Sequence, residues 1–202
     1  MEKNNYGLLI VLSGPSGAGK GTICDELLRK MPNLRYSVSS TTRSPRRGEV
    51  EGVHYYFRQR QEFEAMLARD ELLEWAVFCD NYYGTPRFAV EQAIQEGLDV
   101  ILEIEIQGAL QIKKRFPQGV FTFIVPPSMD VLSERIHKRG TETEEVIQKR
   151  LATAVQELGY VSEYDYVVIN DEVPVAVDKL KSILVAEKCR VKRKPFVFKG
   201  GF

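Results

Sequence analysis

The chain is poor in the residues that build metal centres and disulfide frameworks. Its 202 residues include three cysteines and two histidines. Cys24, Cys79 and Cys189 lie far apart, and none belongs to a C-x-x-C pair, so we expect reduced thiols. His54 and His137 are too few for a histidine-rich metal site. These scarcities argue against a disulfide-stabilised scaffold and against a site built on histidine.

Neither sign of charge is in excess, and long apolar runs are also missing. Lysine plus arginine and aspartate plus glutamate each number 28, so anion binding must come from local clusters. No apolar run approaches the roughly 20 residues that span a bilayer. The N-terminal MEKNNYG lacks the apolar stretch of a signal peptide. We therefore expect a cytoplasmic protein with no membrane and no nucleic-acid partner, and its oligomeric state, including a homo-oligomer, stays open.

Strand patterns and helix patterns alternate along most of the chain. Short apolar runs predict buried strands at 8–12, 121–125 and 166–169, and apolar residues alternating with acidic ones predict a strand at 100–106. Helical spacing is present at roughly 23–31, 86–97, 107–115, 129–139, 143–158 and 174–190. Strands that alternate with helices favour parallel pairing and an α/β layered fold.

The stretch from Tyr36 to Gly84 breaks this alternation. It holds β-rich pieces at 36–40, 54–57 and 72–78 and a single predicted helix near 61–69. We predict an inserted, mostly antiparallel subdomain over 36–85 and a core domain made of 1–35 and 86–202. The charged segment at about 135–150, interrupted by Gly140, is predicted to be mobile.

The stretch GPSGAGKGT, from Gly14 to Thr22, lies between the first predicted strand and a helix. Backbone N–H groups of a glycine-rich turn converge on an anion, and the helix N-terminus adds partial positive charge. Gly17 and Gly19 can take positive φ, and Lys20 supplies a charge for β- and γ-phosphates. A glycine turn that binds nothing is the alternative. The strand, spaced glycines, lysine and helix together favour a phosphate-binding loop.

One position of this loop departs from the pattern G-x-x-x-x-G-K-[ST]. The hydroxyl expected directly after the lysine is displaced by one residue, since Gly21 precedes Thr22. That hydroxyl commonly ligates Mg²⁺, so Thr22 or water must take its place. The ending G-K-G-T resembles adenylate kinases, which hold the metal largely through water, so Gly21 does not argue against nucleotide binding.

Three arginines lie within five positions of the stretch SSTTRSPRRGEVEGVHYYF. Arg43, Arg46 and Arg47 can clamp an anion such as a phosphomonoester, and Tyr55 can add a hydroxyl. A solvated basic hairpin is an equally good interpretation of these residues alone.

The stretch LLEWAVF predicts a strand in which Glu74 points to the face opposite Trp75. A carboxylate accepts two hydrogen bonds side by side, and guanine offers such a pair from N1–H and N2–H₂. Adenine does not offer this pair. If this face lines a pocket, Glu74 recognises guanine, and Thr85 and Ser39 can bind its O6. An exposed glutamate is the alternative.

Seven stretches together resemble the guanylate kinases, phosphate-loop enzymes that phosphorylate GMP with ATP. In chain order they are GPSGAGKGT, SVSSTTRSPRRGEVEGVHY, LEWAVFCDNYYGTP, LEIEIQG, PPS, KRGTETEEVIQKRL and VIND. The resemblance implies a P-loop NTPase three-layer fold with a parallel central sheet, an inserted GMP-binding subdomain and a helical lid at about 135–150. It also implies conversion of GMP, and of dGMP, to GDP with ATP and Mg²⁺, in purine nucleotide metabolism.

The resemblance assigns roles to residues that match the family's motifs. It places ATP at Gly14, Pro15, Ser16, Gly17, Ala18, Gly19, Lys20, Gly21, Thr22 and Asn170. It places GMP at Ser39, Arg43, Arg46, Tyr55, Glu74, Tyr83, Thr85 and Glu105. It places the transferring phosphoryl group at Lys20, Arg43, Arg135, Arg139 and Arg150. For the metal we expect Thr22 and Glu103, directly or through water.

In LEIEIQG, Glu103 and Glu105 stand where the family usually has aspartate. One hypothesis is that the longer Glu103 compensates for Gly21 by reaching towards the water shell of Mg²⁺. The alternative is that the backbone adjusts and nothing changes.

Two other functions stay open at this point. One is a kinase for a different nucleoside monophosphate, although Glu74 with Thr85 argues against AMP. The other is a non-catalytic, guanylate-kinase-like module that binds phosphopeptides, against which Lys20 argues. We also expect Trp75, Phe78 and Phe88 in the core and the basic run 188–195 as a solvated tail.

Overall fold

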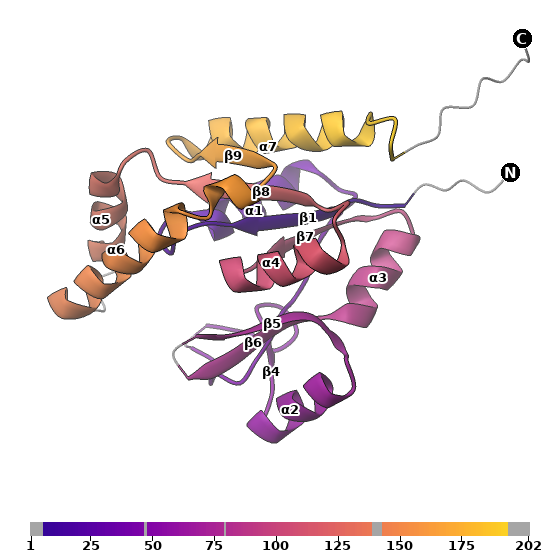
Figure 1. The fold of residues 1–202 in the computed structure, drawn as a ribbon, viewed down its shortest axis with the longest axis horizontal. Coiled ribbons are helices and arrows are strands. Elements are labelled where there is room, and N and C mark those ends of the chain that lie inside the picture. The colour runs from indigo at the N-terminus through magenta and orange to yellow at the C-terminus, as the bar shows by residue number, and fades with distance from the viewer. Residues whose placement is uncertain (1–5, 47, 79, 139–142, 194–202) are drawn as a thin grey trace, which may run out of the picture.

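The computed structural model describes residues 6–46, 48–78, 80–138 and 143–193. These residues form two sheets with flanking helices (Figure 1). The main sheet contains β1 (Leu9–Ser13), β2 (Leu34–Tyr36), β7 (Asp99–Glu103), β8 (Val120–Val125) and β9 (Tyr166–Ile169). The second contains β3 (Ser40–Thr41), β4 (Tyr56–Phe57), β5 (Leu72–Phe78) and β6 (Asn81–Pro86). The helices are α1 (Lys20–Lys30), α2 (Arg60–Ala68), α3 (Arg87–Gln95), α4 (Ile106–Arg115), α5 (Met129–His137), α6 (Glu144–Leu158), η1 (Val161–Glu163) and α7 (Val173–Lys188).

The main sheet is parallel throughout, in the order β2-β7-β1-β8-β9. Successive side chains of a strand point to opposite faces, and β1 buries both of its faces. Ile10 and Leu12 pack with apolar residues of α1 and α7. Leu9 and Val11 pack with residues of α3 and α4. Helices on both faces of a parallel sheet confirm the predicted three-layer α/β fold.

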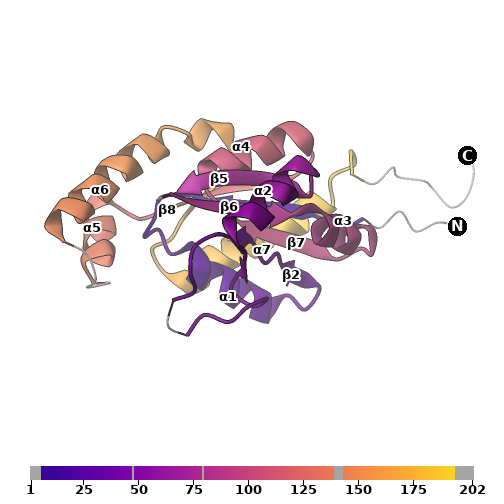
Figure 2. The ribbon, with the colours of Figure 1, turned by 90° about the horizontal axis from the view of Figure 1, so that it is seen from below.

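The second sheet lies on the side of the main sheet that carries α4 (Figure 1). Its order is β4-β3-β6-β5, with β5–β6 and β3–β6 antiparallel and β3–β4 parallel. Phe63 of α2 is fully buried and stacks on Tyr82 with ring centroids 5.2 Å apart. Figure 2 shows α2 and the β5–β6 hairpin in front of the main sheet when the molecule is seen from below.

Two strand predictions need correction at their boundaries. The strand expected over 100–106 ends at Glu103, because the chain turns there and α4 begins at Ile106. The piece expected over 36–40 divides: β2 ends at Tyr36 and pairs with β7 in the main sheet, whereas β3 begins at Ser40 in the second. Strands of three and two residues are too short to show a periodicity that would separate them.

Three aromatic side chains were expected in the core; that of Phe78 lies outside the described ones, and the other two lie at the surface instead. Trp75 is 40% exposed and Phe88 is 79% exposed. The alternation within β5 is as predicted, since Glu74 and Ala76 are buried while Trp75 and Val77 are exposed. Tertiary packing therefore buries the face that carries the carboxylate, because that face meets α4.

The described part of the basic C-terminal run is not a solvated tail. Lys188 forms an ion pair with the buried Asp99. Arg190 and Arg193 form ion pairs with the buried Glu187 at 3.1 and 2.6 Å. Buried carboxylates need partners, and this run supplies them. Within the described residues, no helix combines the length and apolar character that crossing a membrane requires.

Candidate active site

The glycine-rich loop joins β1 to α1 at the carboxyl end of the main sheet. Gly19 caps α1 with φ 87°, and Gly17 has φ 95°, so both take the left-handed conformation that favours glycine. The Lys20 side chain folds back over the loop, and its Nζ donates to the Gly14 carbonyl at 2.6 Å. The loop thus holds a buried ammonium group at the N-terminus of a helix, which is an arrangement suited to phosphate.

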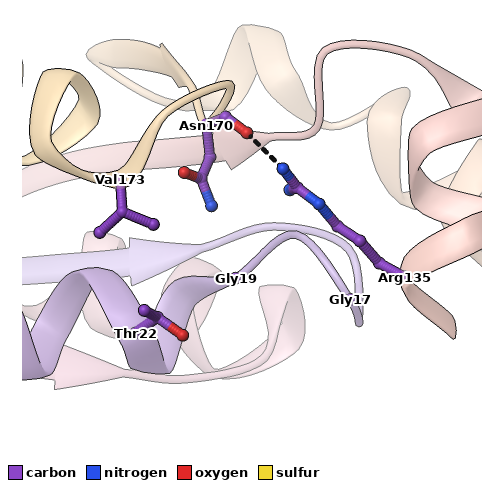
Figure 3. A pocket seen from close by; sticks show the side chains of 6 residues that line it. All are labelled: Gly17, Gly19, Thr22, Arg135, Asn170 and Val173. Atoms are coloured by element: carbon purple, nitrogen blue, oxygen red, sulfur yellow. Dashed lines mark hydrogen bonds between the residues drawn. The ribbon is translucent and has the colours of Figure 1, made fainter. Parts of the chain in front are cut away.

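A cavity of about 260 Å³ opens beside this loop (Figure 3). It is lined by Gly17, Gly19, Thr22, Arg135, Asn170 and Val173. Asn170 Nδ2 donates to the Ala18 carbonyl at 2.7 Å, and Arg135 Nη2 donates to the Asn170 carbonyl at 2.9 Å. Asn170 Oδ1 and Arg135 Nη1 are buried and have no hydrogen-bond partner within the described part of the chain. One acceptor and one donor are therefore free for a ligand.

Helix α6 contacts the phosphate loop at Ser16. Arg150 Nη2 donates to Ser16 Oγ at 2.6 Å. Glu157 lies near the same residue: burial raises its pKa, and the charge of Glu105 raises it further. The charge of Lys20 and a hydrogen bond from the Ser16 backbone lower the pKa of Glu157, but by less than burial and Glu105 raise it. Sequence reasoning missed Glu157, because one glutamate in an amphipathic helix carries no distinguishing pattern.

The carboxylate of Glu103 lies beside the position where the loop lacks its hydroxyl. A Cβ atom at Gly21 would be 3.6 and 3.8 Å from the two Glu103 oxygens. Thr22 lines the adjacent cavity. Oxygen ligands of this kind suit Mg²⁺, so these residues fit the metal that a phosphate loop requires.

An arginine, two tyrosines and a carboxylate lie together in and beside the second sheet, where the sequence predicted the GMP phosphate to bind. Arg43 Nη1 and Nη2 bind both oxygens of Glu49, at 2.9 and 2.8 Å. The Arg43 guanidinium lies 5.4 Å from the centroid of the Tyr55 ring, and the Tyr55 and Tyr83 rings are 6.0 Å apart. The Arg46 backbone N–H also donates to Glu49, at 2.6 Å, while the Arg46 residue is exposed.

Glu49 is a partner of Arg43 that sequence reasoning missed. The hydrogen bond from Arg43 is the main reason that the pKa of Glu49 falls to about 2. The carboxylate is therefore ionised at any physiological pH, and it occupies the fork of an arginine predicted to hold phosphate. Its spacing of six residues from Arg43 matches no regular element, so only the folded loop reveals the pair.

Two of the three residues predicted to recognise guanine, Glu74 and Thr85, meet between β5 and β6. Glu74 is 4% exposed, and Thr85 Oγ1 donates to Glu74 Oε1 at 2.6 Å. Burial raises the pKa of Glu74 to about 7 against the opposing effect of the Thr85 hydrogen bonds. Ser39 is half-buried directly before β3. A buried carboxylate with one oxygen on a hydroxyl is a strong acceptor for a ligand with paired donors.

Burial is the main reason that the pKa of Tyr55 is raised, and the charges of Tyr83 and Glu103 raise it further. Glu105 is exposed at the N-terminus of α4. Arg139, which was predicted to act on the transferring phosphoryl group, lies outside the described residues.

A parallel sheet with a phosphate loop at its carboxyl end, together with a second sheet that carries an arginine and tyrosine cluster, is the arrangement of a phosphate-loop kinase. The guanylate kinase family model matches residues 6–187. The chain belongs to the guanylate kinase family.

Individual relatives agree with this assignment. The chain is 77% identical to the guanylate kinase of Desulfitobacterium hafniense strain Y51, over 98% of this chain and 99% of that protein. It is 58% identical to the guanylate kinase of Caldanaerobacter subterraneus subsp. tengcongensis, over 96% of this chain and 94% of that one. The crystal structure of guanylate kinase from Anaplasma phagocytophilum is similar, with a TM-score of 0.78 and 34% identity, covering 94% and 90% of the two chains.

Proposed function

We propose that the protein transfers the γ-phosphoryl group of ATP to GMP, yielding GDP and ADP, and that it also accepts dGMP. The observation that carries this proposal is the buried Glu74 carboxylate, which accepts a hydrogen bond from Thr85 Oγ1. Its two oxygens match the N1–H and N2–H₂ donors of guanine. The cytoplasm, where both nucleotides are made and used, is the expected location.

On the donor side, ATP places its phosphates in the loop from Gly14 to Thr22. Loop N–H groups and the Lys20 ammonium neutralise phosphate charge there. Asn170 Oδ1, which lacks a partner among the described groups, is an acceptor suited to the 6-amino group of adenine. Thr22 and Glu103 would hold Mg²⁺, which when bound neutralises charge on the β- and γ-phosphates.

On the acceptor side, the phosphate of GMP binds Arg43, Arg46, Tyr55 and Tyr83. Glu49 orients Arg43 by its bidentate pair before the substrate arrives. Glu74, Thr85 and Ser39 recognise guanine, and Glu105 lies nearby at the start of α4.

Transfer requires alignment and charge neutralisation more than acid–base chemistry. An oxygen of the GMP phosphate is already anionic, so it attacks the γ-phosphorus without a general base. The bond from the γ-phosphorus to the bridging oxygen breaks, and ADP leaves with those electrons. Lys20 and the arginines at 135, 139 and 150 neutralise charge on the group in transit. Closure of the lid at 135–150 over the core excludes water, which would otherwise hydrolyse ATP.

The variant Glu74→Gln tests this proposal. Glutamine keeps the shape but turns one acceptor into a donor that faces guanine's donors. We expect the parent to phosphorylate GMP in preference to AMP. In the variant, kcat/KM for GMP should fall by an amount that corresponds to roughly 2 kcal/mol or more of lost transition-state stabilisation. A coupled ADP-release assay with GMP or AMP measures both. A parent that binds GMP without turnover would favour the binding-module alternative, and equal use of AMP would favour a different acceptor.

A further inference from the structure

Helix α4 lies along the free edge of the second sheet. β5 ends the strand order β4-β3-β6-β5, so one of its sides has no partner strand among those described. Gln111 of α4 occupies that side. Its Nε2 donates to the Trp75 carbonyl at 2.7 Å, and the Trp75 N–H donates to its Oε1 at 3.2 Å. One carboxamide thus pairs with both backbone groups of a strand residue, as a neighbouring strand would.

Arg115 continues this contact one turn further along α4. Its Nη1 donates to the carbonyls of Leu72 and Leu73 at 3.1 and 3.2 Å. The strand segment from Leu72 to Trp75 is therefore held at both ends by side chains of one helix. Glu74 lies inside this segment, so the position of its carboxylate depends on α4.

Gly108 completes the same helix face, three residues before Gln111 and seven before Arg115. It is buried, and a Cβ atom there would lie 2.2 Å from Glu74 Oε2 and 2.8 Å from Glu74 Cδ. Glycine is less favourable than alanine inside a helix. At this position it leaves the space that the carboxylate fills, and any side chain would push Glu74 out of place.

We propose that Gly108 and Gln111 are positioning residues that set the base specificity of the enzyme by fixing Glu74. The inference rests on the proposed role of Glu74 in recognising guanine. Gly108 provides room for the carboxylate, and the two hydrogen bonds of Gln111 to the Trp75 backbone fix the position of β5 relative to α4. Both act through Glu74, so their loss weakens recognition of the base and leaves phosphoryl transfer intact.

The test compares Gly108→Ala, Gln111→Met and a matched control, Gln92→Met. Gln92 also lies on a helix and makes a side-chain hydrogen bond, to Glu96 at 2.9 Å, but at an exposed position of α3. Steady-state assays give kcat and KM for ATP and for GMP. They also give the preference for GMP over IMP, which lacks the 2-amino group and offers Glu74 one donor in place of two.

We expect KM for GMP to rise at least tenfold in both α4 variants, with kcat and KM for ATP within twofold of the parent. The preference for GMP over IMP should fall in both variants and stay unchanged in Gln92→Met. In a background that carries Glu74→Gln, neither α4 substitution should cause a further loss. An intact GMP preference, or a loss that adds fully to that of Glu74→Gln, would overturn the inference.

The outcomes of these assays distinguish failure of the proposed function from failure of this inference. If the parent shows no preference for GMP, or if Glu74→Gln does not change KM or kcat for GMP, the proposed role of Glu74 is contradicted. If Glu74→Gln weakens the use of GMP but the α4 variants do not, only this inference is contradicted. Thermal melts by circular dichroism check folding, and Gln111→Met still carries the test if Gly108→Ala does not fold.

Discussion

At the scale of single residues, the burial of Glu74 would couple the proposed recognition of guanine to pH. Its pKa is about 7, mainly because burial disfavours the charged form. If Glu74 accepts guanine's two donors as proposed, the enzyme with a protonated Glu74 must lose that proton to bind GMP. We predict that GMP affinity rises roughly tenfold between pH 6 and pH 8 and then levels off.

Fluorescence or calorimetric titrations with GMP measure this dependence directly. Glu74→Gln serves as the control, because the phosphate of GMP titrates equally with both proteins. The parent should show the additional pH dependence and the variant should lack it. Identical pH profiles for the two proteins would mean that Glu74 stays ionised across this range.

A second prediction at this scale concerns Glu103. Its carboxylate lies beside Gly21, where the loop lacks the usual hydroxyl. If Glu103 reaches the water shell of Mg²⁺, the shorter Glu103→Asp should need several-fold more Mg²⁺ for half-maximal activity at saturating ATP and GMP. An unchanged Mg²⁺ titration would show that the extra methylene has no role in holding the metal.

At the scale of elements, α6 carries a charge to the phosphate loop by packing on α5. Ile147 and Ala154 of α6 pack against Leu132 and Ile136 of α5. That packing directs Arg150 to Ser16, whereas the preceding Lys149 pairs along the exposed helix surface with Glu145 at 3.0 Å. Two adjacent basic residues of one helix therefore have different surroundings.

We predict that Arg150→Met lowers kcat by about 10²–10³, the usual effect of removing a group that neutralises charge in the transition state. The matched control Lys149→Met should leave kcat within about twofold, because exposed helix pairs contribute little. Rapid-quench measurement of the transfer step separates chemistry from product release. Equal effects of the two substitutions would mean that general helix charge matters and the contact with Ser16 does not.

At the scale of the whole molecule, the end of α7 fastens the C-terminal chain to the sheet through buried carboxylates. Glu187 is 1% exposed and accepts hydrogen bonds from Arg193 and Arg190 at 2.6 and 3.1 Å. Burial opposes its ionisation, but hydrogen bonds from Tyr166, Arg193 and Arg190 outweigh burial and lower its pKa below 4.5. The stabilisation is therefore present above pH 4.5 and is lost as pH falls through the lowered pKa.

We predict that Glu187→Gln destabilises the fold by roughly 2 kcal/mol at pH 7, since it leaves two guanidinium groups without their carboxylate. For a chain of this size Tm should fall by roughly 4–8 °C. Below pH 4.5 the difference between parent and variant should narrow. Calorimetry at several pH values measures it, with the exposed Glu145→Gln as a control that should barely change Tm. A constant difference across pH would contradict an ionic origin.

Several features of this molecule could be derived from local patterns. The phosphate loop follows from glycines and a lysine between a strand and a helix, and the structure gives Gly17 and Gly19 the expected positive φ. The alternation of β5 separated Glu74 from Trp75 correctly, because strand periodicity is a property of the backbone. The order of strands and helices likewise predicted the layered α/β fold.

Other features depended on residues that meet only in three dimensions. Glu49 at Arg43, Glu157 near Ser16 and Gln111 at Trp75 carry no local signal, because each partner is chosen by the packing of separate elements. The exposure of Trp75 was missed for the same reason. The sequence by itself determined most of the elements and the phosphate loop, since these rest on short-range periodicity and spacing, and its motifs carried the resemblance to the family. Only the tertiary structure decided which faces are buried and which charges are paired, because burial and pairing are long-range properties of the fold.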